Sequence, residues 1–324
     1  DPSLRYLLDK LAFYILPLVN GDGAYDDDRL SANRININRD MTRLDTPEAV
    51  TLHHVVNRIQ PHIAVDYHEY MPYHERYAAL SNVKVLIPWD VMFFYSGNPN
   101  VSQDLRQIVS GYFLPNASAT IEKYGLTHHL YYSSSLDANG ISFMLGDNSP
   151  TITCTAFGLR NTIALLMETR GIGLRRVSLK RRVYAAYLLA LSVAQTAYGN
   201  DTLVRETLAK SLTRKDSIVV KHSPKPNKMV FPFIDASTNE LRNIDVNVKL
   251  AVSAIPEKAQ KMPEAYYLLP DQQRAVQVLQ EMGVEVSILK KKTKVNATSY
   301  IVVSFEQEET SVKNVVFEKR DQKV

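Results

Sequence analysis

The sequence predicts an α/β fold with a mostly parallel, mixed sheet covered by helices on both faces, followed by a second, smaller strand-rich domain. In the first 200 residues, segments with helical spacing of apolar residues alternate with short apolar runs bounded by turn residues. After about residue 214, prolines interrupt a polar stretch and short alternating segments follow. We therefore place the first domain at residues 1–205 and the second at residues 220–324, joined by a linker.

The composition fits this arrangement and excludes some classes of protein. Of the 324 residues, 45% are hydrophobic and 22% are charged, as in an ordinary globular chain. The net charge of +4 comes from 38 basic and 34 acidic residues spread along the chain, so we expect no nucleic-acid partner. No apolar run reaches the roughly 18 residues that a membrane span needs. The single cysteine, Cys154, excludes an intrachain disulfide.

Two helices and two strands are predicted in the first 70 residues. Apolar residues at helical spacing predict a helix over residues 3–11, and the apolar run 13–19 predicts a buried strand. A threonine cap followed by proline and glutamate at positions 46–48 begins the next helix, which ends at Pro61. The run 63–68 then predicts a second strand.

The remaining elements follow from the same patterns. Residues 162–167 predict a strand, and a long amphipathic helix is expected over 179–198. For the second domain we expect one helix over 271–282 and strands over 246–250, 284–289, 300–305 and 315–324.

Polar residues follow three of the predicted strands at their carboxyl ends. These are the turn at residues 20–23, His68 and Glu168. In open α/β sheets, ligands bind in the crevice outside the carboxyl ends of the strands. The sequence therefore predicts one site where these three segments meet.

Short motifs at these strand ends, and in the loop after the first of them, resemble those of the M14 zinc metallocarboxypeptidases. The resemblance covers residues 16–171 and keeps the family's order of motifs. The second half of the chain is similar only more loosely, to family members with an appended C-terminal β domain. The motifs are Asn20-Gly21-Asp22-Gly23 with Arg29, Ile35-Asn36-Ile37-Asn38-Arg39-Asp40 with Pro47-Glu48, Asp66-Tyr67-His68-Glu69-Tyr70, and Glu168-Thr169-Arg170.

The resemblance implies a role for each of five residues. His68 would be a zinc ligand, and Glu168 would be the general base that takes a proton from water and passes it to the leaving amine. Arg29 would stabilise the oxyanion of the tetrahedral intermediate. Asn38 and Arg39 would hold the terminal carboxylate of the substrate, which a guanidinium can bind through two parallel hydrogen bonds. Without the motifs, a lone histidine at a strand end is more often a satisfied or solvent-facing residue.

The sequence departs from the family pattern in its metal ligands. The family takes its other two zinc ligands from a His-x-x-Glu motif, and none of the eight histidines here has glutamate three residues later. In the family this motif precedes the first strand of the resemblance, so we expect it upstream of Asp1. Because catalytic zinc needs about three protein ligands, we expect this polypeptide alone to bind zinc poorly and to hydrolyse little.

Two further departures concern the turn and a tyrosine. Gly21 replaces a proline of the family, which changes the turn and leaves the chemistry alone. The family's mobile tyrosine has no counterpart in residues 140–167; Tyr131 and Tyr132 are the nearest, and the role is assigned to neither.

The function expected from this resemblance is zinc-dependent hydrolysis of the C-terminal peptide bond of peptides with a free carboxylate. Two alternatives stay open: an amidase or deacylase of the same fold, acting on cell-wall peptides or acylated amino acids, and a non-catalytic protein that binds peptide C-termini. A serine hydrolase is not expected, because no Gly-x-Ser-x-Gly motif occurs, and Cys154 lacks a nucleophile signature. The resemblance favours a periplasmic or secreted protein and leaves the oligomeric state open.

Overall fold

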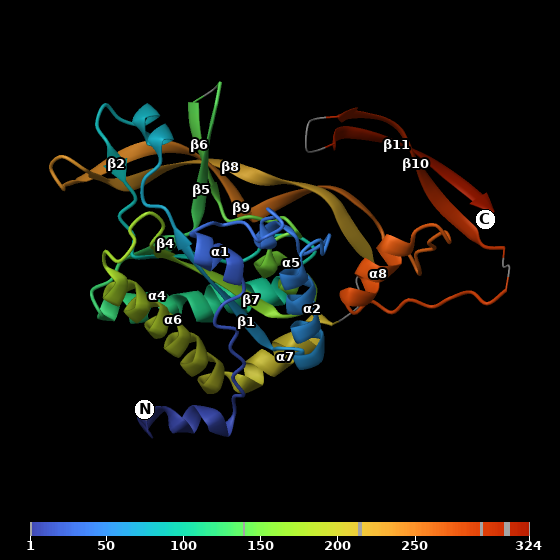
Figure 1. Ribbon diagram of the computed structural model, residues 1–324, viewed down its shortest axis with the longest axis horizontal. Helices are drawn as coiled ribbons and strands as arrows, with labels where there is room; N and C mark the ends of the chain where they lie inside the picture. Colours follow the sequence, from blue (N-terminus) through green and yellow to red (C-terminus); the bar gives the residue numbers. More distant parts are fainter. Residues whose placement is uncertain (1, 139, 213–215, 292–293, 308–311, 324) are drawn as a thin grey trace. The chain divides into compact units, whose positions relative to one another are not determined.

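The computed structural model describes residues 2–138, 140–212, 216–291, 294–307 and 312–323 (Figure 1). These residues belong to two compact units, Asp1–Gly283 and Val284–Val324. Among them no helix is long and apolar enough to cross a membrane.

The first unit contains all the described helices and most of the strands. Its α-helices are α1 (Gly21–Asp26), α2 (Pro47–Ile59), α3 (Gln103–Ile108), α4 (Leu114–Lys123), α5 (Thr153–Leu159), α6 (Leu179–Gly199), α7 (Asp201–Ser211) and α8 (Gln273–Glu281). Shorter turns of helix are η1 (Pro2–Asp9), η2 (Ile37–Arg39), η3 (Glu75–Ala79) and the π-helical η4 (Val109–Phe113). Its strands are β1 (Ile63–Tyr70), β2 (Val85–Leu86), β3 (Val91–Phe94), β4 (His128–Leu130), β5 (Tyr132–Asp137), β6 (Gly140–Leu145), β7 (Ile163–Arg170), β8 (Ser217–Asp235) and β9 (Leu241–Lys261).

A four-stranded mixed sheet in the order β1-β7-β3-β4 lies at the centre of this unit. Strand β1 runs parallel to β7 and β4 parallel to β3, whereas β3 and β7 are antiparallel. This arrangement confirms the expected mixed, mostly parallel sheet.

Helices cover both faces of this sheet, as expected (Figure 1). On one face, Ile163, Leu165 and Met167 of β7 pack in a cluster with apolar residues of α3, α4, α6 and α7. On the other face, Ala164 and Leu166 pack with residues of α2 and α5. This alternation follows from the two-residue period of a strand and explains why the run is apolar throughout.

A second sheet in the order β2-β8-β9-β6-β5 completes the first unit. The long strands β8 and β9 pair antiparallel, and β9 also pairs parallel with β6. Aromatic side chains fill the core between this sheet and the rest of the unit, with Phe143, Phe231 and Phe233 fully buried beside Tyr77 and Tyr132.

The second unit contains one pair of strands among its described residues. Strands β10 (Asn296–Gln307) and β11 (Val312–Lys323) form an antiparallel two-stranded sheet. Both strands match segments expected from the sequence.

Several elements differ from expectation, and the clearest is the N-terminal apolar run. The strand expected over 13–19 is wrong: these residues form a loop, and Ile15 is 80% exposed. Pro17 has no N–H to donate, and no described strand pairs with this segment. The expected helix over 3–11 is a 3₁₀ helix, Pro2–Asp9. The strand expected over 284–289 is also absent from the described residues.

The division into units also falls elsewhere than the expected domain boundary. We placed the boundary between residues 205 and 220, but the compact units divide after Gly283. The physical reason is the sheet: β8 and β9 join β6, so the chain up to Lys261 belongs to the same unit as the central sheet. Helix α7 and the start of β8 occupy most of the expected linker.

Candidate active site

His68 and Glu168 lie side by side at the carboxyl ends of two neighbouring strands. In the parallel register of β1 and β7, His68 is paired with Glu168. Their positions on adjacent parallel strands place both side chains at the edge where ligands bind in sheets of this kind. The structure thus brings together two residues that are 100 positions apart in the sequence.

Glu168 is a buried carboxyl group with an unusual environment. The residue is 7% exposed, and its Oε2 has no hydrogen-bond partner among the described residues. Burial raises the pKa of this carboxyl to about 7; the charge of His68 opposes the rise, and that of Asp66 adds to it. A carboxyl group whose pKa lies near neutral pH can both accept and release a proton there.

Asp66 orients His68 on the same strand. Residues two apart on a strand share a face, and Asp66 Oδ2 lies 2.8 Å from His68 Nε2. Burial acts to lower the pKa of His68, but the hydrogen bond and charge of Asp66, with the charge of Glu168, outweigh burial and raise it. The contact leaves Nδ1 as the ring nitrogen available to another group.

Thr153 connects Asp66 with Asn38. It is the first residue of α5, and its backbone N–H donates to Asn38 Oδ1 at 2.8 Å. Its hydroxyl lies 3.1 Å from the same oxygen and also donates to Asp66 Oδ2. A continuous line of hydrogen bonds therefore runs from Asn38 through Thr153 and Asp66 to His68.

The loop that carries Asn38 and Arg39 is fixed by its neighbours. Buried Asp40 accepts hydrogen bonds from the backbone of Asp45 and of Thr46, the residue that caps the N-terminus of α2. Ile37 and Met41 are buried in the core cluster below. These contacts hold η2 in place while the Arg39 side chain stays exposed, with its guanidinium 3.7 Å from Asp147.

Arg29 lies on a separate loop, and its positive charge acts on residues of the site. Asn20 braces this loop: its Oδ1 accepts from Gly23 N, and its Nδ2 donates to the carbonyls of Arg29 and Leu30. Gly23 leaves no room for a side chain, since a Cβ there would lie 2.4 Å from the Asp28 carbonyl oxygen. The positive charge of Arg29 opposes the rise in the pKa of both Glu168 and His68, so its guanidinium lies within electrostatic reach of them.

Tyr131 adds a hydroxyl that sequence reasoning left unassigned. Its backbone is pinned by hydrogen bonds to Phe93 and Gly146. Burial raises the pKa of the Tyr131 hydroxyl to about 12; Glu168 adds to the rise, whereas Arg29 and Arg39 oppose it. The charges of Arg29, Arg39 and Glu168 therefore all act on the Tyr131 hydroxyl.

The described residues do not form a complete metal site. No group of three or more His, Cys, Asp or Glu side chains among them could hold a metal ion. His68 is the one residue here that the resemblance marks as a ligand, and its Nε2 is engaged by Asp66. The described residues therefore do not by themselves make up the three protein ligands that a catalytic zinc ion needs.

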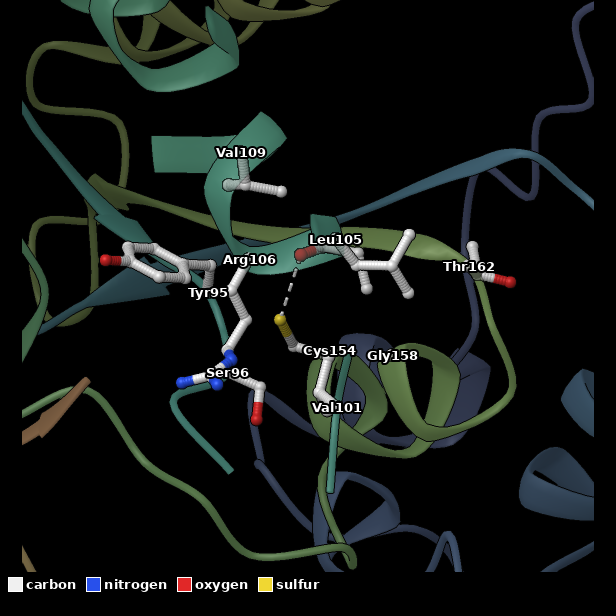
Figure 2. A pocket seen from close by; sticks show the side chains of 10 residues that line it. Tyr95, Ser96, Val101, Leu105, Arg106, Val109, Cys154, Gly158 and Thr162 are labelled. Atoms are coloured by element: carbon white, nitrogen blue, oxygen red, sulfur yellow. Dashed lines mark hydrogen bonds between the residues drawn. The ribbon is translucent and has the colours of Figure 1, made fainter. Parts of the chain in front are cut away.

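Cys154 does not belong to this chemistry, although it follows Thr153 directly. Its side chain faces a small cavity lined by residues of α3 and β7 among others (Figure 2). The thiol donates to the carbonyl of Ala164, and burial raises its pKa far above the usual range. A thiol held in this way is not a nucleophile at neutral pH.

The structure thus pairs His68 with Glu168 at one sheet edge and connects Asn38 with His68 through Thr153 and Asp66, while Arg29 acts on them through its charge and Arg39 is exposed. The residues that sequence reasoning missed are Thr153 and Asp147, and it left Tyr131 unassigned. Thr153 lies in an apolar, threonine-rich run with nothing to distinguish it, because its contacts are made with residues 87 and 115 positions away.

Comparison with known proteins shows similarity to fungal proteins named as carboxypeptidases. The chain is 25% identical over 289 residues to a probable carboxypeptidase 2 of Arthroderma benhamiae, covering 87% of this chain and 54% of that protein. It is 26% identical over 291 residues to carboxypeptidase 2 of Trichophyton rubrum, covering 87% and 53%. The chain spans about half the length of the curated relatives it matches. No family model matches the sequence.

Two solved structures are similar over part of the chain. A putative carboxypeptidase A from Shewanella denitrificans matches 61% of this chain and 49% of its own with a TM-score of 0.44 and 18% identity. A metallo-carboxypeptidase from Pseudomonas aeruginosa, in complex with (2-guanidinoethylmercapto)succinic acid, matches 63% and 50% with a TM-score of 0.45 and 18% identity. These likenesses are too distant to bear on the arrangement of side chains.

Proposed function

We propose that this chain is part of a metallocarboxypeptidase that hydrolyses the C-terminal peptide bond of peptides with a free carboxylate. The observation that carries the proposal is the pairing of buried Glu168 with His68 at one sheet edge, joined by hydrogen bonds through Asp66 and Thr153 to Asn38. The similarity to proteins named as carboxypeptidases supports it.

In this proposal Asn38 and Arg39 bind the terminal carboxylate of the substrate. Asn38 Oδ1 accepts from Thr153, which leaves the amide Nδ2 to donate to an anion. Arg39 is exposed, and its contact with Asp147 at 3.7 Å is loose enough to be exchanged for a substrate carboxylate. A substrate with a free carboxylate would therefore find two donors at the rim of the site.

Glu168 would carry the proton during hydrolysis. A pKa of about 7 suits a base that takes a proton from the attacking water and later gives it to the leaving amine. Arg29 would stabilise the oxyanion, and the Tyr131 hydroxyl, protonated at neutral pH with a pKa of about 12, would donate a hydrogen bond to the substrate.

Zinc is part of the proposal, although this chain supplies only one expected ligand, His68. When bound, the metal would polarise the scissile carbonyl and lower the pKa of a water molecule. The other ligands would come from a His-x-x-Glu pair outside these 324 residues.

A second candidate is a non-catalytic protein that binds peptide C-termini. One observation favours it: the described residues hold no complete set of metal ligands. Both candidates would bind a peptide carboxylate through Asn38 and Arg39, but only the first would hydrolyse the peptide.

Carboxylate recognition can be tested on this chain by isothermal titration calorimetry. An N-blocked dipeptide with a free C-terminus should bind, and the same dipeptide with a C-terminal amide should bind at least tenfold more weakly. Arg39→Ala should weaken binding of the acid about 10- to 100-fold, the loss expected for charge-assisted hydrogen bonds. The control Arg43→Ala removes an exposed arginine that pairs with Asp45 and should leave the affinity unchanged. Equal affinity for acid and amide would contradict the proposal.

A further inference from the structure

The two-stranded sheet of the second unit has an edge strand that no other described strand covers. Strand β10 pairs with β11 along one edge only, and no other described strand joins them. An isolated two-stranded sheet is marginally stable in water at best, because it has too little apolar surface to bury. Further pairing or packing would therefore add stability to these two strands.

Strand β10 exposes apolar side chains on both of its faces. Tyr300 and Val302 lie on one face and Ile301 on the other, whereas Val303 and Phe305 fall in a stretch where the register with β11 shifts between Val302 and Ser304 and again between Ser304 and Glu306. Each of these five side chains is between 40% and 54% exposed. Consecutive apolar residues of this kind occur in strands that are covered on both faces, so the exposed β10 resembles an internal strand of a larger sheet.

The charges of the two strands show which edge is open to another strand. Residues 295–305 carry no charged side chain, and the segment is bounded by Lys294 and Glu306. Strand β11 carries Glu318, Lys319, Arg320 and Asp321 in succession. Charged residues on an edge strand prevent pairing with further strands, and their absence permits it. The edge of β10 is therefore the open one.

We propose that β10 pairs with β10 of a second copy of this chain, antiparallel across a two-fold axis, to form a four-stranded sheet. The antiparallel arrangement is favoured by the bounding charges, because it brings Lys294 of one copy toward Glu306 of the other, at both ends of the shared edge. A parallel pairing would instead place like charges together. The β11 strands would then lie at the two outer edges of these four strands, where their charged residues disfavour pairing with a third copy. This inference is independent of the proposed function.

The oligomeric state of the full chain tests this proposal, measured by analytical ultracentrifugation over a range of micromolar concentrations. We expect a dimer. Ile301→Lys, which places a charge on the shared strand in both copies, should raise the dimer dissociation constant at least tenfold. The matched control is Ile288→Lys, which changes an 85% exposed isoleucine of the same unit and should leave the dimer intact. Circular dichroism of each variant checks that the fold is retained.

The bounding charges allow a second, independent test. Lys294→Glu should weaken the dimer, because it places a glutamate near Glu306 of the other copy and the two negative charges repel. The double variant Lys294→Glu with Glu306→Lys should restore the dimer. Three results would overturn the proposal: a wild-type monomer at all concentrations, a dimer that Ile301→Lys leaves unchanged, or aggregates that keep growing with concentration. A charge reversal that the second substitution fails to rescue would overturn the antiparallel arrangement.

Discussion

Glu168 is the residue at which the needs of stability and of chemistry oppose each other most directly. Its carboxyl group is buried, its Oε2 has no described partner, and burial raises its pKa to about 7. The folded state therefore binds this proton more tightly than the unfolded chain does, and ionising the group above pH 7 costs on the order of 3 kcal/mol. Such a cost is typical of a residue kept for function.

This environment predicts a pH dependence for the metal-free chain. Because the folded pKa is raised, stability should be highest below the unfolded value near 4.5 and should fall as the pH rises to about 7, with the penalty constant above that. Glu168→Gln removes the titrating group, so its free energy of unfolding should exceed that of the wild type at pH 8 by more than it does at pH 5. Urea denaturation at both pH values measures the difference. An equal difference at both would show that Glu168 ionises normally.

Replacing Thr153 tests whether a residue that positions Asn38 affects substrate recognition without contacting the substrate itself. Thr153→Val keeps the shape of the side chain but loses the hydroxyl that bonds to Asp66 and Asn38. We expect the preference of the chain for a free C-terminal carboxylate over its amide to fall about tenfold, because Asn38 is less firmly held. Calorimetry with the two dipeptides measures this ratio.

Thr153→Ser is the control, since it restores the hydroxyl and should restore the preference. If both variants keep the wild-type ratio, the hydrogen-bonded line from Asn38 to His68 has no part in recognition.

At the scale of elements, the sequence predicted those elements whose ends are marked by local chemistry. Helix α2 begins at the expected position because Thr46 accepts from Ala49 N and proline occupies the first turn. Strands β1 and β7 were recognised because each is a short apolar run that ends in a polar residue. The run 13–19 has the same composition but no neighbouring strand in the described chain, and pairing of that kind leaves no local signal.

Buried Asp90 joins the central sheet to α6 through an ion pair with the half-exposed Arg181. Its carboxylate accepts from Arg181 at 2.6 Å and 2.8 Å and from Thr127 N at 2.9 Å. Burial acts to raise the pKa of Asp90, but the hydrogen bonds from Arg181 and Thr127 outweigh burial and lower it. The pair therefore stabilises the fold while Asp90 is ionised.

Asp90→Asn should lower the free energy of unfolding by about 1–3 kcal/mol at pH 7. The loss should be smaller than for a fully buried pair, because water can partly solvate the half-exposed Arg181. Because the folded pKa is lowered, this difference should persist above about pH 4 and shrink as the pH falls through the folded pKa.

The control is Asp104→Asn, which breaks an exposed pair with Lys210 and should change stability by less than about 0.5 kcal/mol. Urea denaturation of both variants measures the two effects. A loss for Asp104→Asn as large as that for Asp90→Asn would show that burial does not set the strength of the Asp90 pair.

At the scale of the whole molecule, the alternation of strands and helices predicted the fold class, and the observed pairing of β1 with β7 brings the candidate residues His68 and Glu168 together. It did not predict where the compact units divide, because the parallel pairing of β9 with β6 joins segments about 100 residues apart. The proposed site likewise draws on segments from Asn20 to Arg170. Motif order singled out Glu168 and His68 as candidates, whereas contacts such as those of Thr153 depend on packing that only the folded chain shows.

The most direct test of the central claim is peptide hydrolysis with zinc by a polypeptide that extends this chain upstream through a His-x-x-Glu pair, measured beside the chain alone. The account predicts that only the extended form binds one zinc and releases C-terminal residues. Glu168→Gln in that form should keep the zinc and lose about 10²- to 10⁴-fold in turnover. An extended form that binds no zinc, or a Glu168→Gln variant with undiminished turnover, would contradict the claim.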